Sequence, residues 1–188
     1  MYARIIVGLS LGFLLSPLML GAAEEKISSR EVTFPTPDGG LVSADLYGSG
    51  KHGVVLAHGR IFDKSTWRPQ AIRLAQEGLV ALSIDFRGYG ATKAGGEQGA
   101  LYNDVLAAIR YLHGTGFEEV SVVGASMGGG AAARAAIESK AGEIDRLILL
   151  SPVPVENPET MVAGALFYIV SGGDRLAASV REQYERAP

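Results

Sequence analysis

The sequence predicts a layered α/β fold: a mostly parallel sheet with helices on both faces, entered through an antiparallel hairpin. Three observations predict this fold class. Short apolar runs alternate with longer segments of helical spacing from residue 54 onward. The apolar runs are continuous, which is typical of parallel strands that are buried on both faces. Before them, two strand-like segments flank a Pro-Asp-Gly-Gly turn at 37–40, which predicts a hairpin.

The first residues differ from the rest of the chain. One basic residue, Arg4, precedes an apolar run that extends to Leu20, and small residues follow it up to Ala23. This order is typical of a secretory signal peptide, so we expect residues 1–23 to be removed and residues 24–188 to be secreted or periplasmic. A retained membrane anchor is the alternative, but two glycines and a proline interrupt the run. After cleavage we expect no stable membrane insertion.

The elements follow from this alternation in chain order. Strands are expected at 31–34, 41–47, 54–57, 79–84, 120–123, 147–150 and 166–170. Helices are expected at 65–77, 101–113, 127–139 and after Asp174. Gly78 and Gly114 are expected to end the first two helices, because glycine adopts the left-handed conformation common at helix C-termini. The interval 151–165 is too short for an inserted lid, so we expect an open site and small or accessible substrates.

Composition excludes several classes of function. The chain has 188 residues, of which 47% are hydrophobic and 20% charged, and this balance suits one domain with its own core. The net charge of -3 comes from interspersed acids and bases, so a nucleic-acid partner has no electrostatic support. The absence of cysteine excludes disulfides, thiolate metal sites and a cysteine nucleophile. No metal site or cofactor is predicted.

Ser126 stands between two glycines in the run Gly124-Ala125-Ser126-Met127-Gly128. The G-x-S-x-G pattern marks a nucleophile elbow where it joins a strand to a helix, as it is predicted to do here. The glycines remove side chains where a strained turn brings backbone segments close together. The helix that begins at Met127 directs free N–H groups toward an oxyanion formed beside Ser126. This arrangement predicts acyl-transfer chemistry.

The chain resembles the α/β-hydrolase family from residue 31 to its end. VVLAHGR is similar to the third strand and oxyanion loop of that family, and ALSIDFRGYG to the fourth strand and its following turn. FYIVSGGDRL is similar to the seventh strand and the acid loop. The resemblance implies a sheet of the α/β-hydrolase type without a large lid domain. It also implies a serine hydrolase that cleaves a carboxylic ester, or a related acyl bond in a small molecule, through an acyl-enzyme on Ser126.

The resemblance also implies roles for individual residues. Asp174 is the acid that orients the catalytic base. Glu156 is the alternative acid by its position, because it follows the strand expected at 147–150, which ends at the same edge of the sheet as Ser126. The oxyanion hole is formed by the N–H groups of Met127 and of Arg60 or Ile61. The turn residues Asp85 and Arg87 are expected to hold the turn by local bonds, and Trp67 and Phe62 to line an acyl pocket or to join the core.

The catalytic base is the one residue of the family's triad for which this sequence has no candidate at the expected position. The family's histidine follows the acid, but His52, His58 and His113 all precede Asp174. His52 and His113 are expected at the sheet edge opposite Ser126. His58 is expected at the same edge as Ser126, where the resemblance implies that it shapes the oxyanion loop; a catalytic role for His58 is the alternative.

The segment after Asp174 is short for the fold that the resemblance implies. A helix, a strand and their connections need about 20 residues before a histidine could return to the site, and fourteen residues, 175–188, follow. We therefore expect the chain to lack its last strand and triad histidine. The alternative function is a non-catalytic α/β-hydrolase-like binding domain. A cysteine-dependent enzyme like dienelactone hydrolase is disfavoured because cysteine is absent.

Overall fold

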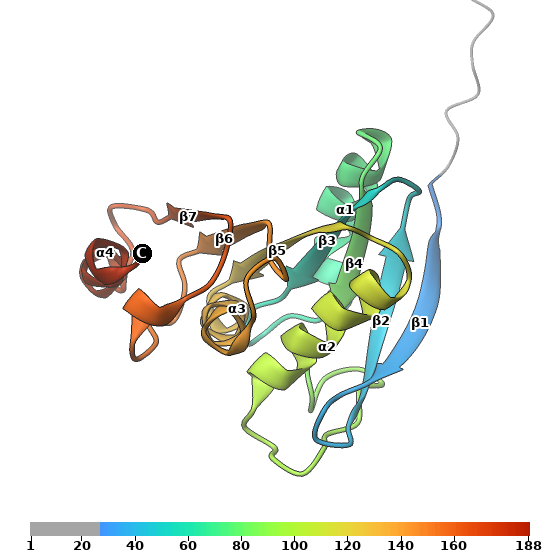
Figure 1. Cartoon of the computed structure of the whole chain (residues 1–188), viewed down its shortest axis with the longest axis horizontal. Helices are drawn as coiled ribbons and strands as arrows, with labels where there is room; N and C mark the ends of the chain where they lie inside the picture. Colours follow the sequence, from blue (N-terminus) through green and yellow to red (C-terminus); the bar gives the residue numbers. More distant parts are fainter. Residues whose placement is uncertain (1–26) are drawn as a thin grey trace, which may run out of the picture.

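The structure is a computed structural model that describes residues 27–188, so the predicted signal peptide lies outside the described residues. Seven strands form one sheet in the order β1-β2-β4-β3-β5-β6-β7 (Figure 1). The strands are β1 (Ser29–Pro35), β2 (Leu41–Tyr47), β3 (His52–Ala57), β4 (Val80–Ile84), β5 (Glu119–Ala125), β6 (Arg146–Leu150) and β7 (Ala165–Ile169). The helices are α1 (Arg68–Gln76), α2 (Leu101–Gly114), α3 (Met127–Glu138) and α4 (Ala177–Arg186), with 3-10 turns η1 (Lys64–Trp67) and η2 (Pro158–Thr160).

The predicted fold class is confirmed. β1 and β2 form the antiparallel hairpin, β2 pairs antiparallel with β4, and the strands β3 to β7 are parallel to one another. The C-terminal ends of the parallel strands therefore lie at one edge of the sheet, which we call the catalytic edge. At this edge Ala125 of β5 is in register with Leu150 of β6, and Leu150 with Ile169 of β7.

Two helix boundaries differ from the sequence predictions. The helix expected at 65–77 is divided into η1 and α1, with Pro69 near the start of α1. Proline favours that place, because it lacks an N–H and the first N–H groups of a helix have no intrahelical partner. Gly114 does not end α2 but belongs to it, and the left-handed turn is made by Gly116 at φ 101°.

Helices cover both faces of the sheet (Figure 1). α2 and α3 bury their apolar sides against one face, where the main core includes Val122, Leu147 and Leu149. α1 covers part of the other face over a smaller cluster that contains Val54 and Leu56. None of the helices in residues 27–188 combines the length and the apolar character that crossing a bilayer requires.

Candidate active site

Ser126 lies at the turn that joins β5 to α3, and its backbone is strained. Its φ is 52° and its ψ is -113°, a region that residues with a side chain rarely adopt. The Ser126 N–H donates to the carbonyl of Leu150 at 2.9 Å. The Ser126 carbonyl accepts from the N–H groups of Gly130 and Val153, each at 3.0 Å. These bonds hold the turn while the serine side chain stays exposed at the catalytic edge.

The glycines on either side of Ser126 are required by close backbone contacts. A Cβ on Gly124 would lie 2.8 Å from the carbonyl carbon of Gly128. A Cβ on Gly128 would lie 2.5 Å from the carbonyl oxygen of His58 and would also overlap that of Ala57. The first turn of α3 therefore sits directly on the end of β3, which is the steric need predicted from the G-x-S-x-G pattern.

Residues 58–63, which we call the oxyanion loop, follow β3 and pass beside Ser126. A Cβ built on Gly59 would lie 3.7 Å from the Ser126 Cβ, so the loop backbone and the serine are in contact range. Met127 is the first residue of α3, where backbone N–H groups lack intrahelical acceptors. The structure thus brings Met127 and the loop that carries Arg60 and Ile61 next to the predicted nucleophile.

His58 is buried at 1% exposure, and both of its ring nitrogens face backbone groups. Nε2 lies 3.3 Å from the Phe86 nitrogen and accepts from its N–H, and Nδ1 donates to the Gly59 carbonyl at 2.9 Å. With both nitrogens engaged and the ring inaccessible, His58 does not serve Ser126 as a base in this arrangement. The geometry agrees with the expectation that His58 shapes the oxyanion loop.

The other two histidines lie at the edge opposite Ser126. His52 opens β3, with Nδ1 2.9 Å from a Glu119 carboxylate oxygen and Nε2 2.8 Å from the Ser121 hydroxyl. His113, near the end of α2, has its ring nitrogens 2.8 and 2.9 Å from the carbonyl oxygens of Phe117 and Glu143. All three histidines of the chain are therefore described, and each is engaged away from the Ser126 side chain.

Asp174 lies at the catalytic edge, in the loop between β7 and α4. Its Oδ1 accepts from the N–H of Leu176 at 2.8 Å. This backbone bond and the Ser151 hydroxyl lower the pKa of Asp174, so the side chain is a carboxylate at neutral pH. Ser126 and Asp174 follow strands β5 and β7, which have β6 between them, so their strand ends are separated by about 10 Å. That separation leaves room for a side chain between them.

The alternative acid, Glu156, is exposed in the loop before η2. Trp67 is buried in the smaller core cluster with Leu56, so it joins the core rather than an acyl pocket. Phe62 is 48% exposed, and its ring is 3.4 Å from the Cβ position of Gly59. Of these three residues, Phe62 is the one that belongs to the oxyanion loop.

Asp85 and Arg87 hold the turn after β4, as expected. Asp85 Oδ1 accepts from the N–H of Lys64 at 2.8 Å, and burial raises the pKa of Asp85. Arg87 donates to the carboxylates of Asp104 and Asp38. Although burial alone would lower the pKa of Arg87, these carboxylates raise it. The turn is therefore tied to the start of η1, to α2 and to the β1–β2 hairpin.

Tyr89, which follows Arg87 and Gly88 in the same turn, is a candidate site residue that the sequence motifs did not predict. Its hydroxyl donates to the Arg60 carbonyl at 2.6 Å and lies 3.7 Å from the Met127 sulfur. The sequence signal was limited to an aromatic residue between two glycines. Only the folded chain shows that this residue reaches both candidate oxyanion-hole residues.

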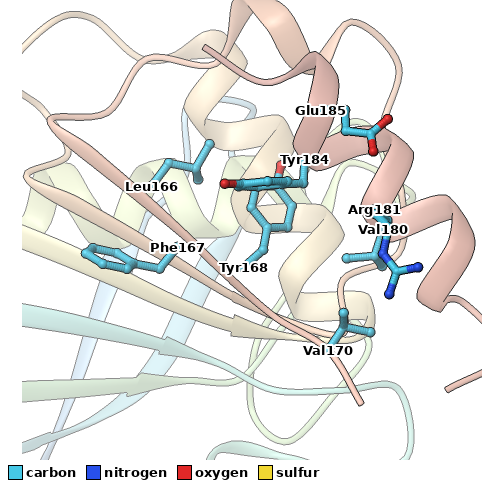
Figure 2. Close-up of a pocket in the computed structure, with 8 residues that line it drawn as sticks. All are labelled: Leu166, Phe167, Tyr168, Val170, Val180, Arg181, Tyr184 and Glu185. Atoms are coloured by element: carbon cyan, nitrogen blue, oxygen red, sulfur yellow. The ribbon is translucent and has the colours of Figure 1, made fainter. Parts of the chain in front are cut away.

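Two hollows differ in their relation to Ser126. A cavity of about 270 Å³ is bordered by Met127, Gly130 and Val153, which adjoin or bond the serine backbone. A groove of about 550 Å³ lies between β7 and α4 and includes neither Ser126 nor Asp174 (Figure 2). Neither hollow is lined by Ser126 or Asp174, and the smaller one adjoins the candidate site only through these backbone neighbours of the serine.

One group of side chains in residues 27–188 could hold a metal ion. The ligand atoms of His52, Glu119 and Asp145 lie within 4.8 Å of one another. This group is at the edge opposite Ser126, and His52 already bonds Glu119 and Ser121. The site at Ser126 does not use it.

The sequence profile of the Alpha/beta hydrolase family matches residues 54–187. The chain belongs to the alpha/beta hydrolase family. A non-heme haloperoxidase from Rhodococcus erythropolis is 29% identical over 120 residues, which are 62% of this chain and 42% of the haloperoxidase. The chain thus spans less than half the length of that haloperoxidase.

Solved structures share the alpha/beta hydrolase fold. An esterase from Pyrococcus furiosus has a TM-score of 0.72 at 22% identity, covering 85% of this chain and 77% of the esterase. At that identity the likeness shows the fold alone. An esterase from Exiguobacterium antarcticum has a TM-score of 0.58 at 28% identity, covering 65% of this chain and 46% of that enzyme.

Proposed function

We propose that the protein is a serine hydrolase that cleaves a carboxylic ester or a related acyl bond through an acyl-enzyme on Ser126. The observation that carries the proposal is the strained backbone of Ser126, at φ 52° and ψ -113°, which presents an exposed hydroxyl between β5 and α3. Strain of this kind persists only where the surrounding structure imposes it, and it is concentrated at functional sites. Membership of the alpha/beta hydrolase family supports a hydrolase.

In the proposed reaction Ser126 Oγ attacks the ester carbonyl carbon while its proton passes to a base. The carbonyl oxygen becomes negatively charged and accepts hydrogen bonds from the N–H groups of Met127 and Arg60. The N-terminus of α3 adds its positive dipole end to this stabilisation. Collapse of the intermediate releases the alcohol, which takes the proton from the base, and water then hydrolyses the acyl-enzyme by the same steps.

None of the described histidines is placed to accept the proton of Ser126. Because the pKa of Asp174 is lowered by the Leu176 N–H and the Ser151 hydroxyl, its carboxylate is available to orient an imidazole at neutral pH. His52, His58 and His113 are engaged elsewhere. We propose that a histidine outside these 188 residues supplies the imidazole in the active protein.

The substrate we propose is a small or accessible ester. The segment between β6 and β7 folds as a loop with the short turn η2, and the side chain of Ser126 is exposed. We also propose that the protein acts outside the cytoplasm after removal of residues 1–23. N-terminal sequencing of the exported protein tests this, with Glu24 expected as the first residue.

A fluorophosphonate probe tests the nucleophile, because it forms a stable adduct with an activated serine. We expect mass spectrometry to place the adduct on Ser126, with faster labelling when imidazole is added. Ser126→Ala should abolish labelling, whereas Ser171→Ala, which alters an exposed serine at the same sheet edge, should not. Labelling that persists in Ser126→Ala would overturn the assignment. A wild-type protein that stays unlabelled even with added imidazole would favour the second candidate, a non-catalytic binding domain, which the engaged histidines support.

A further inference from the structure

We propose that Tyr89 is a positioning residue of the oxyanion hole: its hydroxyl holds the Arg60–Ile61 peptide so that the loop presents the Arg60 N–H, and not the Ile61 N–H, as the second oxyanion donor. The inference deepens the proposed function and rests on it. Tyr89 itself does not touch the reacting atoms in this proposal.

The contacts of Tyr89 place it between the two halves of the hole. Its O–H donates to the Arg60 carbonyl at 2.6 Å, and the same oxygen lies 3.7 Å from the Met127 sulfur. Its ring meets the buried His58 ring edge-on, with centroids 4.8 Å apart and planes at 70°. One side chain thus contacts the oxyanion loop at its start and its centre, and also the first residue of α3.

Because peptide groups are planar, these contacts also fix the directions in which the neighbouring backbone N–H groups point. In a trans peptide the C=O and the following N–H point in opposite directions, and the described chain has no cis peptide bond. Since the Arg60 carbonyl points to the Tyr89 hydroxyl, the Ile61 N–H points away from Tyr89 and from the Met127 sulfur beside it. The Ile61 N–H is therefore turned away from the side of the loop on which the Tyr89 hydroxyl and the Met127 sulfur lie.

The preceding peptide is fixed in the same manner. The Gly59 carbonyl accepts from His58 Nδ1 at 2.9 Å and from the Phe62 N–H at 3.1 Å. The Arg60 N–H must then point away from the buried His58 ring, toward the accessible side of the loop, where Ser126 is exposed. Of the two donors that the sequence left open, this geometry favours Arg60.

Tyr89 can hold the loop because its own turn is anchored. The Tyr89 N–H donates to the Phe86 carbonyl at 2.9 Å. Gly90, at φ 50°, lies so close to Asp85 that a Cβ would be 2.6 Å from the carboxyl carbon. Asp85 in turn accepts from the Lys64 N–H at 2.8 Å, just beyond the far end of the oxyanion loop. The turn is therefore bonded to the start of the loop, where the Phe86 N–H donates to His58 Nε2, and to Lys64 just beyond its end, and Tyr89 supplies the central bond.

The test compares Tyr89→Phe with the wild-type 188-residue chain. This substitution removes the hydroxyl and keeps the ring against His58. Tyr184→Phe is the matched control, since that tyrosine also meets an aromatic ring edge-on, at a centroid distance of 5.6 Å from Tyr168, but lies on α4. Three quantities are measured: amide hydrogen exchange of residues 58–64, the rate of fluorophosphonate labelling of Ser126, and ester hydrolysis with added imidazole.

For Tyr89→Phe we expect faster amide exchange in residues 58–64 and a fall in labelling rate and kcat of roughly 3- to 10-fold, the effect of losing one hydrogen bond. KM and the melting temperature should change little, and Tyr184→Phe should behave as wild type. Unchanged exchange in Tyr89→Phe would overturn the proposal, as would faster exchange with unchanged kcat. If no variant is labelled and Ser126→Ala has wild-type activity, the proposed function fails, and with it the oxyanion role; the exchange data then still decide whether Tyr89 orders the loop.

Discussion

Arg87 and Asp104 form an ion pair that is closed to solvent: Nη2 lies 2.7 Å from Oδ1, and the two side chains are 1% and 0% exposed. A buried charge needs all of its partners, because an unmatched one is costly in the interior. Arg87 has a second partner, Asp38, at 2.7 Å. Arg87 therefore couples the turn that carries Tyr89 to α2 through Asp104 and to the β1–β2 hairpin through Asp38.

Replacing Asp38 should destabilise the fold in a pH-dependent way. Bonds from Arg87, and next from Thr36, hold the pKa of Asp38 well below its usual range. Since an unfolded aspartate has a pKa of about 3.9, this contribution is complete above that value and is lost as the pH falls through the lower native pKa. We expect Asp38→Asn to lower the free energy of unfolding by about 2 kcal/mol at pH 7.

Urea unfolding at pH 7 and at successively lower pH checks this prediction. The difference between Asp38→Asn and wild type should narrow below pH ~4. Glu77→Gln is the control, because Glu77 pairs with Arg73 on the surface of α1 and should contribute less than about 0.5 kcal/mol. A difference for Asp38→Asn that stays constant with pH would contradict the role assigned to its charge.

Adding one methyl group at Gly128 should damage the elbow. Because its Cβ would overlap the carbonyl oxygens of Ala57 and His58, we expect Gly128→Ala to lower the free energy of unfolding by about 2–3 kcal/mol. Gly114→Ala is the control: nothing lies within 4 Å of its Cβ position in α2, so a neutral or slightly stabilising effect is expected. Chemical unfolding of both variants provides the measurement. Equal free energies of unfolding for Gly128→Ala and Gly114→Ala would show that the elbow is not tightly packed.

Added imidazole should restore activity if the missing component is a base. Without one, Ser126 remains a weak nucleophile, and we expect the 188-residue chain to retain only a residual acceleration over water, about 10³- to 10⁴-fold. Hydrolysis of a short-chain aryl ester should rise with imidazole concentration in the wild type beyond the rise seen in Ser126→Ala. Full activity without imidazole would mean that a group already present serves as the base.

Strand β7 should promote self-association of residues 24–188. Among the described strands it pairs only with β6, and Phe167 and Ile169 are 50% and 59% exposed. Figure 2 shows Phe167 directed away from the Tyr168–Tyr184 pair. An apolar edge without a charge or proline is a template for pairing with another chain.

Size-exclusion chromatography of residues 24–188 checks the prediction. We expect Phe167→Lys to shift the elution of this protein toward the monomer, because an edge lysine opposes strand pairing. Leu41→Lys, which replaces an exposed leucine in β2, should not have this effect. A monodisperse wild-type monomer would show that the exposed β7 edge is tolerated.

The order of elements and the position of the elbow were predictable because they depend on local patterns. Continuous apolar runs identified the parallel strands, and the glycines around Ser126 identified a turn that excludes side chains. The boundaries of α1 and α2 were less predictable. The start of α1 depended on how Pro69 was accommodated, and the end of α2 depended on whether Gly114 or Gly116 adopted the left-handed conformation.

By itself, the sequence determined the fold class, the elbow at Ser126 and the scarcity of candidate bases, since periodicity, glycine spacing and residue counts are properties of the chain. Only the tertiary structure decided that both nitrogens of His58 are engaged and that the Tyr89 hydroxyl reaches the Arg60 carbonyl. The reason is physical: these bonds join residues from the ends of β3 and β4, and a hydrogen bond depends on distances and angles that form only when neighbouring strands align.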